Sequence, residues 1–170
     1  MPRDLMARLS RDGMLRFRGA EYRAAFGRGG IRDDKQEGDG ATPAFALPLR
    51  RVLFRADRVA RPRAAVPVEP LAPLDGWCDD PADAGYNRMV TLPYAGRHEE
   101  LWRDDALYDV VGVLGWNDDP VVRDRGSAIF LHVARADFAP TEGCVALPLP
   151  DLLALLAAGC LGVDTAAAPQ

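Results

Sequence analysis

Hydrophobic positions along this chain form short runs and short alternations with polar residues, the pattern typical of β-strands rather than of long helices. The strongest core signal is Ser127–Val133, an almost continuous apolar run of strand length, which is typical of a strand buried on both faces. Two alternating segments, Leu15–Arg18 and Tyr22–Phe26, are joined by Gly19-Ala20 and predict an N-terminal hairpin.

Other segments complete a sheet-rich outline. Further strands are predicted at Phe45–Phe54, Tyr86–Leu92, Leu107–Leu114 and Gly143–Leu147. Because proline cannot donate to a sheet ladder, Pro48 should interrupt the first of these strands or place it at an edge. Helices are predicted at Leu152–Ala158, after Pro150-Asp151, and at His98–Trp102. Residues 61–85 contain five prolines and should form a long surface excursion.

Length and composition then fix the class of fold. With 170 residues, of which 48% are hydrophobic and 27% charged, we expect a single domain over residues 1–170. The predicted fold is mainly β, a β-sandwich with one or two short helices. The net charge of −4 does not indicate a protein that binds nucleic acid. No run approaches the ~18 apolar residues of an integral membrane segment, and no secretory leader is visible at the start.

The three cysteines, Cys78, Cys144 and Cys160, bound the chemistry. An odd number cannot all pair within one chain, and no CxxC motif occurs, so neither a disulfide framework nor a zinc ribbon is indicated. Cys78 is followed by Asp79 and Asp80, but this spacing does not support a metal site. We therefore expect no metal and no cofactor, and we expect Cys160, at the end of an Ala/Leu helix, to serve packing.

His132 and Cys144 form the candidate catalytic pair. The histidine ends the apolar strand and the cysteine follows twelve positions later, past a loop, so a strand–loop–strand return can bring the two side chains together. A neighbouring imidazole lowers a thiol's pKa and accepts its proton. Gly143 permits a tight backbone before Cys144, whose neighbouring amides could face an oxyanion. Spacing alone leaves an alternative open, in which the histidine is a hydrogen-bonded core residue and the cysteine serves packing.

The local motifs add a family resemblance. Gly126–His132, followed by Pro140–Leu147 with Thr141-Glu142-Gly143-Cys144, closely resembles the catalytic segment of the L,D-transpeptidase (YkuD-like) family, which has a strand histidine and a downstream Ser/Thr-x-Gly-Cys motif. Asp39-Gly40-Ala41-Thr42-Pro43 is similar to the family's Asp-Gly-x-Thr-Pro segment. The resemblance covers roughly residues 14–160.

The resemblance implies a β-rich enzyme acting on peptidoglycan stem peptides. Cys144 would form an acyl-enzyme with release of D-Ala, and a second stem would resolve the thioester as a 3→3 cross-link. The histidine is oriented in this family by a backbone carbonyl, so Gly143 and Val133 are assigned to oxyanion and backbone support. Thr141 and Ser127 fall among the expected substrate contacts. Carbapenems would be acylating inhibitors, and the expected location is the periplasm or cell envelope, although without a visible leader a cytoplasmic location stays open.

Two departures from the family pattern keep other functions open. Val133 stands where many members have Gly after the histidine, and Ala146 stands where many have Arg two residues after the cysteine. That Arg usually lies near the acyl site, so a peptidoglycan hydrolase or L,D-carboxypeptidase using the same pair is an alternative. A catalytically weakened peptidoglycan-binding module is another. Relatives often end in a further strand, but Val163–Gln170 is poor in strand formers, so an edge strand is expected to be missing.

Several other residues have two interpretations. Trp116 precedes a turn-forming Asn-Asp-Asp-Pro segment and could form a wall of the substrate groove. Arg135 could face a substrate carboxylate, with Arg125 also near in sequence, although an exposed loop arginine is the more frequent case. His98 lies among charged residues and is expected at the surface rather than in a site.

Overall fold

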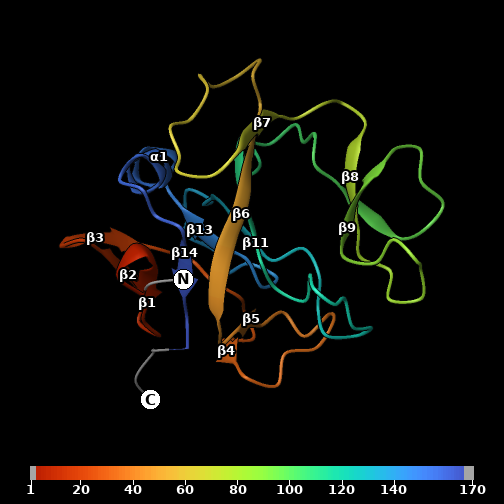
Figure 1. Ribbon diagram of the computed structural model, residues 1–170, viewed down its shortest axis with the longest axis horizontal. Coiled ribbons are helices and arrows are strands. Elements are labelled where there is room, and N and C mark those ends of the chain that lie inside the picture. Colours follow the sequence, from red (N-terminus) through yellow and green to blue (C-terminus); the bar gives the residue numbers. More distant parts are fainter. Residues whose placement is uncertain (1–2, 167–170) are drawn as a thin grey trace.

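A computed structural model describes residues 3–166 (Figure 1). After a short 3₁₀ turn, η1 (Arg3–Leu5), the chain forms strands and one α-helix, α1 (Leu149–Ala157). The strands are β1 (Ala7–Leu9), β2 (Met14–Phe17), β3 (Ala20–Arg23), β4 (Ile31–Arg32), β5 (Thr42–Pro43), β6 (Ala46–Phe54), β7 (Val68–Pro70), β8 (Asp75–Cys78), β9 (Arg88–Thr91), β10 (His98–Glu100), β11 (Val110–Leu114), β12 (Phe130–Val133), β13 (Val145–Leu147) and β14 (Gly162–Asp164). The prediction of a mainly β fold is confirmed.

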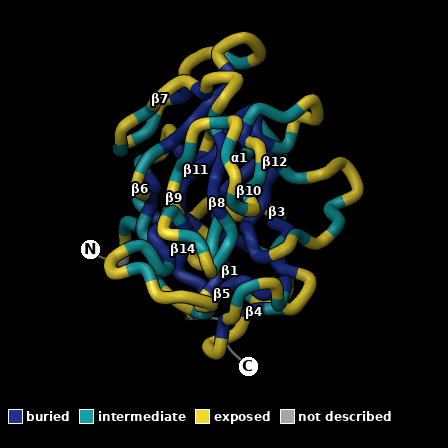
Figure 2. Tube along the Cα trace, turned by 90° about the vertical axis from the view of Figure 1, so that its right-hand side faces the viewer, coloured by how far each residue is buried: buried dark blue, intermediate teal, exposed yellow. Residues whose placement is uncertain are grey.

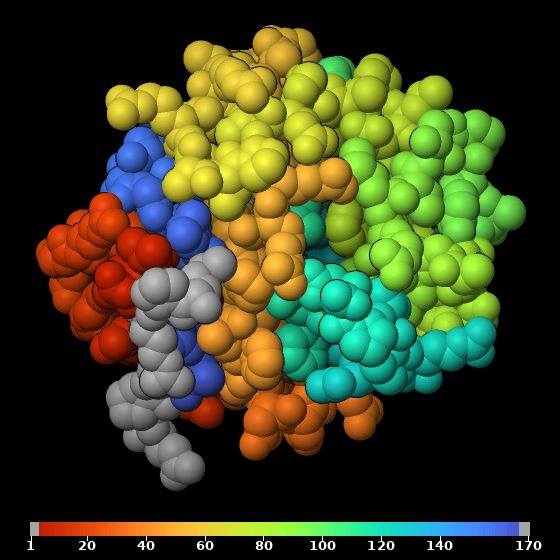
Figure 3. All heavy atoms as spheres, in the orientation of Figure 1, coloured from red at the N-terminus to blue at the C-terminus, as the bar shows by residue number. Residues whose placement is uncertain are grey.

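One large sheet carries the candidate site. Its strand order is β13-β12-β11-β6-β14-β1-β2-β3, and β7 pairs with the second half of β6. The long strand β6 runs through the middle of Figure 1, with the N-terminal strands on one side of it. Space-filling Figure 3 shows the same division, with the N-terminal strands (red) beside the C-terminal segment (blue) and the β8–β10 region (yellow-green and green) on the opposite side.

The two ends of this sheet meet. The backbone N–H of Ala25, just after β3, donates to the carbonyl of Ala146 in β13 at 2.8 Å, and the N–H of Ala146 donates back at 2.9 Å. Two further bonds join Thr141 to Phe26 and Arg28. The sheet therefore curls into a barrel-like sandwich, and its interior is filled by apolar side chains from both ends.

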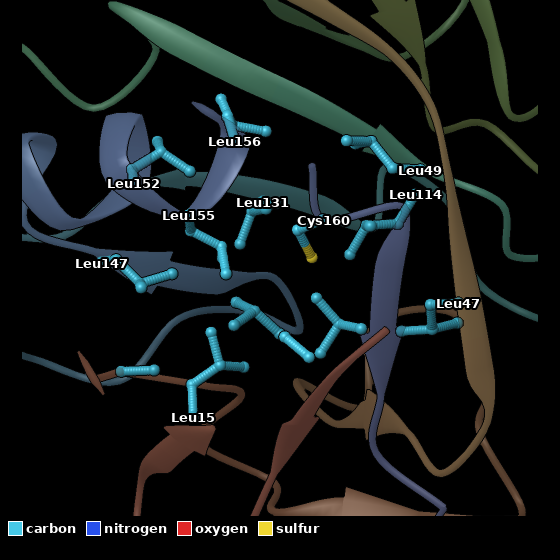
Figure 4. Close-up of a cluster of buried hydrophobic side chains, with 14 of the residues drawn as sticks. Leu15, Leu47, Leu49, Leu114, Leu131, Leu147, Leu152, Leu155, Leu156 and Cys160 are labelled. Atoms are coloured by element: carbon cyan, nitrogen blue, oxygen red, sulfur yellow. The ribbon is translucent and has the colours of Figure 1, made fainter. Parts of the chain in front are cut away.

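Helix α1 closes part of this interior. Pro148 precedes the helix, Pro150 lies in its first turn, and Asp151 places an acid near its positive end, as predicted. Leu152, Leu155 and Leu156 are fully buried. Figure 4 shows their side chains converging with leucines of β6, β11 and β12, and the Cys160 sulfur lies among them. Cys160 also donates to the Gly162 carbonyl at 3.1 Å, so it is a packing residue of this core.

A second, three-stranded sheet covers the other face. Its order is β10-β8-β9, and Trp77 of β8 packs edge-on against Phe130 of β12, with ring centroids 5.1 Å apart. A second apolar cluster forms between these sheets and includes Cys144. Figure 2 shows buried strand segments inside the molecule and exposed loops around them. Within residues 3–166, no helix is long and apolar enough to cross a membrane.

The predictions for His98–Trp102 and residues 61–85 need correction. Residues His98–Glu100 form strand β10, paired with Gly76–Cys78, and not a helix. The Pro-rich excursion is interrupted by β7 and β8, and Trp77 and Cys78 of β8 are buried. In both places pairing with distant segments overrides local propensity, because short strands gain their stability from packing against neighbours.

Two further predictions about the sheet are wrong. Strand β6 continues through Pro48 as a central strand. Its ladder with β11 is irregular close by, because Val113 pairs with Arg51 and Leu114 with Leu49, which leaves Arg50 of β6 as the extra residue. The C-terminal region does form a strand, β14, which lies between β6 and β1 and is fully buried. Gly162 fits there because an added Cβ would lie 2.4 Å from the Leu47 carbonyl oxygen. Residues 167–170 of the predicted strand-poor tail lie outside the described residues.

Candidate active site

Strands β12 and β13 place the predicted pair on one face of the sheet. They run parallel, with Leu131 opposite Val145, His132 opposite Ala146 and Val133 opposite Leu147. Side chains alternate between the faces of a strand. Leu131, Val133, Val145 and Leu147 belong to the larger core, whereas Phe130 and Cys144 belong to the cluster on the opposite face. His132 and Ala146 share that second face by alternation.

The register also sets the separation of the pair. Cys144 immediately precedes β13, so it lies diagonal to His132 across the ladder, offset by two residues. With parallel strands ~4.8 Å apart and a rise of ~3.3 Å per residue, such positions are roughly 8 Å apart between Cα atoms. An imidazole and a thiol directed toward each other span that separation.

The turn before Cys144 is held by side-chain and backbone bonds. The Thr141 hydroxyl donates to the Cys144 carbonyl at 2.6 Å and accepts from the Gly143 N–H at 3.1 Å. Gly143 has φ +140°, and a Cβ there would lie 2.8 Å from the Ala41 carbonyl oxygen. The Thr42 hydroxyl donates to the Gly143 carbonyl at 2.8 Å. The Asp-Gly-Ala-Thr-Pro segment thus supports the cysteine turn, and a side chain at position 143 would disrupt it.

The Cys144 thiol is buried and protonated at rest. Its sulfur donates to the Ala128 carbonyl at 3.2 Å and accepts from the Phe130 N–H at 3.3 Å. Burial, followed by the negative charge of Glu99, raises the pKa of the thiol to about 12. No hydrogen bond joins this thiol to His132 among residues 3–166. The sulfur therefore keeps its proton in this hydrogen-bonded arrangement.

His132 is neutral and oriented. Its Nδ1 lies 2.8 Å from the carbonyl oxygen of Val133, an acceptor, so Nδ1 carries the ring proton. Burial lowers the pKa of His132 to about 4. Every fully buried side-chain nitrogen or oxygen in the described part of the chain has a partner, and Nε2 has none there. Nε2 is therefore accessible, with its lone pair available to accept a proton.

Both residues line a cavity of about 520 Å³ that is rich in charged groups. Arginine or lysine side chains at its wall are Lys35, Arg97, Arg103 and Arg135, and carboxylates are Glu37, Asp79, Glu99 and Glu142. Tyr108 contacts both Glu99 and His132. Its hydroxyl donates to Glu99 at 2.8 Å, and its ring packs edge-on against the His132 ring with 5.3 Å between centroids. Such a cavity suits a ligand that carries both charges.

The structure brings most of the sequence-predicted residues to this cavity. Ser127, Thr141 and Arg135 line it, with Arg135 exposed and the Ser127 hydroxyl donating to Glu37 at 2.8 Å. Trp116 does not line it. Its indole donates to the Arg125 carbonyl at 2.8 Å, and its ring packs against Phe45 in a separate surface groove. Arg125 lies in that groove as well.

His98, Cys78 and Asp79 are engaged in local contacts of the fold. His98 is half-buried, and its Nδ1 lies 2.7 Å from the Gly96 carbonyl oxygen. Cys78 is buried, and Asp79 pairs with Arg97 at 3.0 Å. Within the described residues, no group of three or more His, Cys, Asp or Glu side chains could hold a metal ion.

A comparison with protein families decides the classification. The profile of the L,D-transpeptidase catalytic domain, YkuD, matches residues 4–165. The chain belongs to the L,D-transpeptidase family. No curated protein and no solved structure matches it. L,D-transpeptidases act on peptidoglycan and are generally associated with the cell envelope.

Sequence reasoning missed part of the wall of this L,D-transpeptidase cavity. Glu99 and Tyr108 were not singled out, and Glu99 lies in a segment predicted to be helical. Lys35, the chain's one lysine, is buried and pairs with Asp39 at 2.5 Å. Its rarity among twenty arginines was a signal that could have drawn attention to it.

Proposed function

We propose that this chain is a cysteine-dependent L,D-transpeptidase acting on peptidoglycan stem peptides in the periplasm or cell envelope, as a single catalytic domain. The observation that carries the proposal is the presence of Cys144 and a neutral, oriented His132 on one face of the sheet and in one cavity. A binding module has no need of a protected thiol, an accessible imidazole nitrogen and the glycine turn together.

The first half-reaction uses both residues. The thiol turns from Ala128 to Nε2 of His132, which accepts its proton as the sulfur attacks the stem-peptide carbonyl carbon. Because the pKa of Cys144 is high, proton transfer and attack are coupled rather than preceded by a standing thiolate. The C–N bond then breaks, the imidazolium gives its proton to the departing D-Ala amine, and a thioester remains on Cys144.

Backbone groups are available for the oxyanion. The Gly143 N–H is already bonded to Thr141, whereas the Cys144 N–H makes no hydrogen bond among the described residues. We therefore assign oxyanion stabilisation to the Cys144 amide and turn formation to Gly143. Val133 supports the histidine through its carbonyl.

The second half-reaction decides between transfer and hydrolysis. An amine of a second stem attacks the thioester to give a 3→3 cross-link, and water gives a shortened peptide. Ala146 lines the cavity and bears no charge at the position where many relatives have Arg. This favours hydrolysis, or L,D-carboxypeptidase activity, as the second candidate, while the charged wall residues, including Arg135, supply other means of holding the acceptor.

Purified muropeptides and mass spectrometry test the proposal. We expect D-Ala release and dimeric 3→3 products, and a single carbapenem adduct on Cys144. Cys144→Ala should abolish all three results, and Cys160→Ala should retain them as a matched control. Tripeptide alone across the whole range of acceptor concentrations would assign the hydrolase function. The absence of any adduct or product with the folded protein would reject the proposal.

A further inference from the structure

Glu99 presents a free carboxylate oxygen to the cavity. Its Oε2 accepts a hydrogen bond from Tyr108 at 2.8 Å, and no hydrogen bond to Oε1 occurs within residues 3–166. Every fully buried side-chain nitrogen or oxygen there has a partner, so Oε1 is not fully buried. Because Glu99 lines the cavity, that oxygen is open to whatever binds there.

Two of the other carboxylates of the wall form ion pairs, whereas Glu37, like Glu99, forms none among residues 3–166; Glu99 is the carboxylate whose charge raises the pKa of the Cys144 thiol. Asp79 pairs with Arg97 and Glu142 pairs with Arg28, and Glu37 accepts hydroxyls from Tyr86 and Ser127. Three of the wall cations are engaged, since Arg97 pairs with Asp79, Arg103 with Asp105 and Lys35 with Asp39, whereas Arg135 forms no ion pair among the described residues. Glu99 forms no ion pair among the described residues. A half-buried carboxylate without a cation is stabilised by a cationic ligand.

Glu99 also lies close to the reacting groups. Its charge contributes to the raised pKa of the Cys144 thiol, and its partner Tyr108 meets the His132 ring edge-on. Burial raises the pKa of Glu99 itself to about 7, with Asp79 and Glu37 acting in the same direction and the Tyr108 hydrogen bond and Arg103 opposing it. A carboxylate of this kind exchanges protons near neutral pH.

We propose that Glu99 binds the ammonium group of the acceptor and removes one of its protons before the acceptor attacks the thioester. This inference rests on the proposed function and names its acceptor as a primary amine that arrives as a cation. The ammonium gives one proton to the Glu99 carboxylate, and the neutral amine then attacks the thioester carbon. A C–N bond forms and the C–S bond breaks. His132 takes the second proton from nitrogen and returns it to the Cys144 sulfur, and Glu99 releases its proton to solvent.

Glu99→Gln separates this role from a structural one, because the amide retains an oxygen for Tyr108 and lacks the charge. Two nucleophiles are compared in the same acyl transfer from a muropeptide: D-methionine, whose amine is a cation at neutral pH, and hydroxylamine, which is uncharged. We expect transfer to D-methionine to fall by about tenfold to a hundredfold, with a raised acceptor KM, since hydrogen bonds to charged groups contribute ~1.5–3 kcal/mol. Transfer to hydroxylamine should change less than about threefold.

Two controls complete the test. Glu100→Gln removes a carboxylate from the adjacent, exposed position of β10 and should leave both transfers unchanged. Carbapenem acylation of Cys144 should not slow in Glu99→Gln, because the charge of Glu99 raises the pKa of the thiol and its loss makes proton transfer from the sulfur easier. An equal loss with both nucleophiles, or normal transfer to D-methionine, would overturn the inference alone. A wild-type protein that forms neither adduct nor product would overturn the proposed function and this inference with it.

Discussion

The Cys144 thiol donates to the carbonyl oxygen of Ala128, 3.2 Å away, although His132 lies on the same face of the same pair of strands. Ala128 has φ +53°, a left-handed conformation that non-glycine residues seldom adopt. Strained backbone of this kind persists where surrounding contacts hold it. The strained backbone directs this carbonyl at the Cys144 sulfur, so the thiol is held in a hydrogen-bonded, protonated form.

Substitution of Cys144 should abolish activity, whereas substitution of Cys160 should affect only stability. Cys144→Ala is expected to reduce D-Ala release below a few per cent, because no other thiol lines the cavity among residues 3–166. Cys160→Ala should keep activity and lower the free energy of unfolding by about 1–2 kcal/mol, since it removes a buried sulfur from the leucine core. Muropeptide turnover and chemical denaturation measure the two effects. Substantial turnover by Cys144→Ala would refute the assignment of the nucleophile.

His132 should make stability fall as the pH falls. Its pKa is about 4 in the folded protein against 6.5 for an ordinary histidine, so the unfolded chain binds more protons between these values. The expected loss from pH 7 to pH 4 is about 3 kcal/mol from this group. Glu99, whose pKa is raised to about 7, acts with the opposite sign in an overlapping window.

Because the two groups oppose each other, the His132 effect is measured as a difference. Denaturation of wild type and His132→Gln at pH 7 and pH 4.5 should show the variant gaining stability relative to wild type at the lower pH. An identical pH dependence in the two proteins would show that His132 does not titrate with a lowered pKa.

Gly143→Ala should damage the cysteine turn. The added Cβ would meet the Ala41 carbonyl oxygen, and φ +140° is unfavourable for any side chain. A stability loss of about 1–3 kcal/mol is expected from the strain. Carbapenem acylation should fall by at least about tenfold, because a small displacement of a nucleophile is costly. Gly19→Ala, also at positive φ but with open space around its Cβ, serves as the control for conformational strain alone.

Substitution of Trp116 should lower stability without changing activity, whereas substitution of Arg135 should change substrate binding without lowering stability. Trp116 is buried outside the cavity, so Trp116→Ala is expected to lower the free energy of unfolding by about 3–5 kcal/mol while kcat/KM of the folded fraction stays within about threefold. Arg135 is exposed at the cavity wall, so Arg135→Ala should leave stability unchanged and raise the KM for the stem peptide. Thermal unfolding and steady-state kinetics distinguish them, and a reversed pattern would place Trp116 in the substrate site.

The sequence predicted those parts of the fold that depend on local pattern. Ser127–Val133 contains the buried strand β12, and β2 and β3 form the expected N-terminal hairpin. Its turn is Arg18-Gly19 rather than Gly19-Ala20, because Ala20 already pairs with Phe17 in the ladder. The errors arose where distant segments decide the structure. His98–Glu100 is a charged strand because β8 lies beside it, and Gly162–Asp164 is a central strand because β6 and β1 enclose it.

The residues of the candidate site also fall into those marked by a local sequence motif and those brought in by distant segments. Cys144, His132 and Gly143 were recognisable because their motif lies within one short stretch of chain. Glu99 and Tyr108 reach the cavity from the segment between β9 and β11, and no local pattern marks them. Trp116 was placed by its proximity in sequence to a core strand, but the chain turns its side chain toward Phe45 instead.

The reciprocal bonds between Ala25 and Ala146 also determine when the turn around Cys144 can form during folding. The turn that carries Cys144 is completed by backbone from just after β3, so its assembly waits for contacts between segments that are very distant in the chain. Closure of such long loops is slow compared with local hairpin formation. In a nascent or partly unfolded chain the turn around Cys144 is therefore incomplete. An insertion in the loop after β3 would disturb the candidate active site, although that loop is far from Cys144 in the sequence.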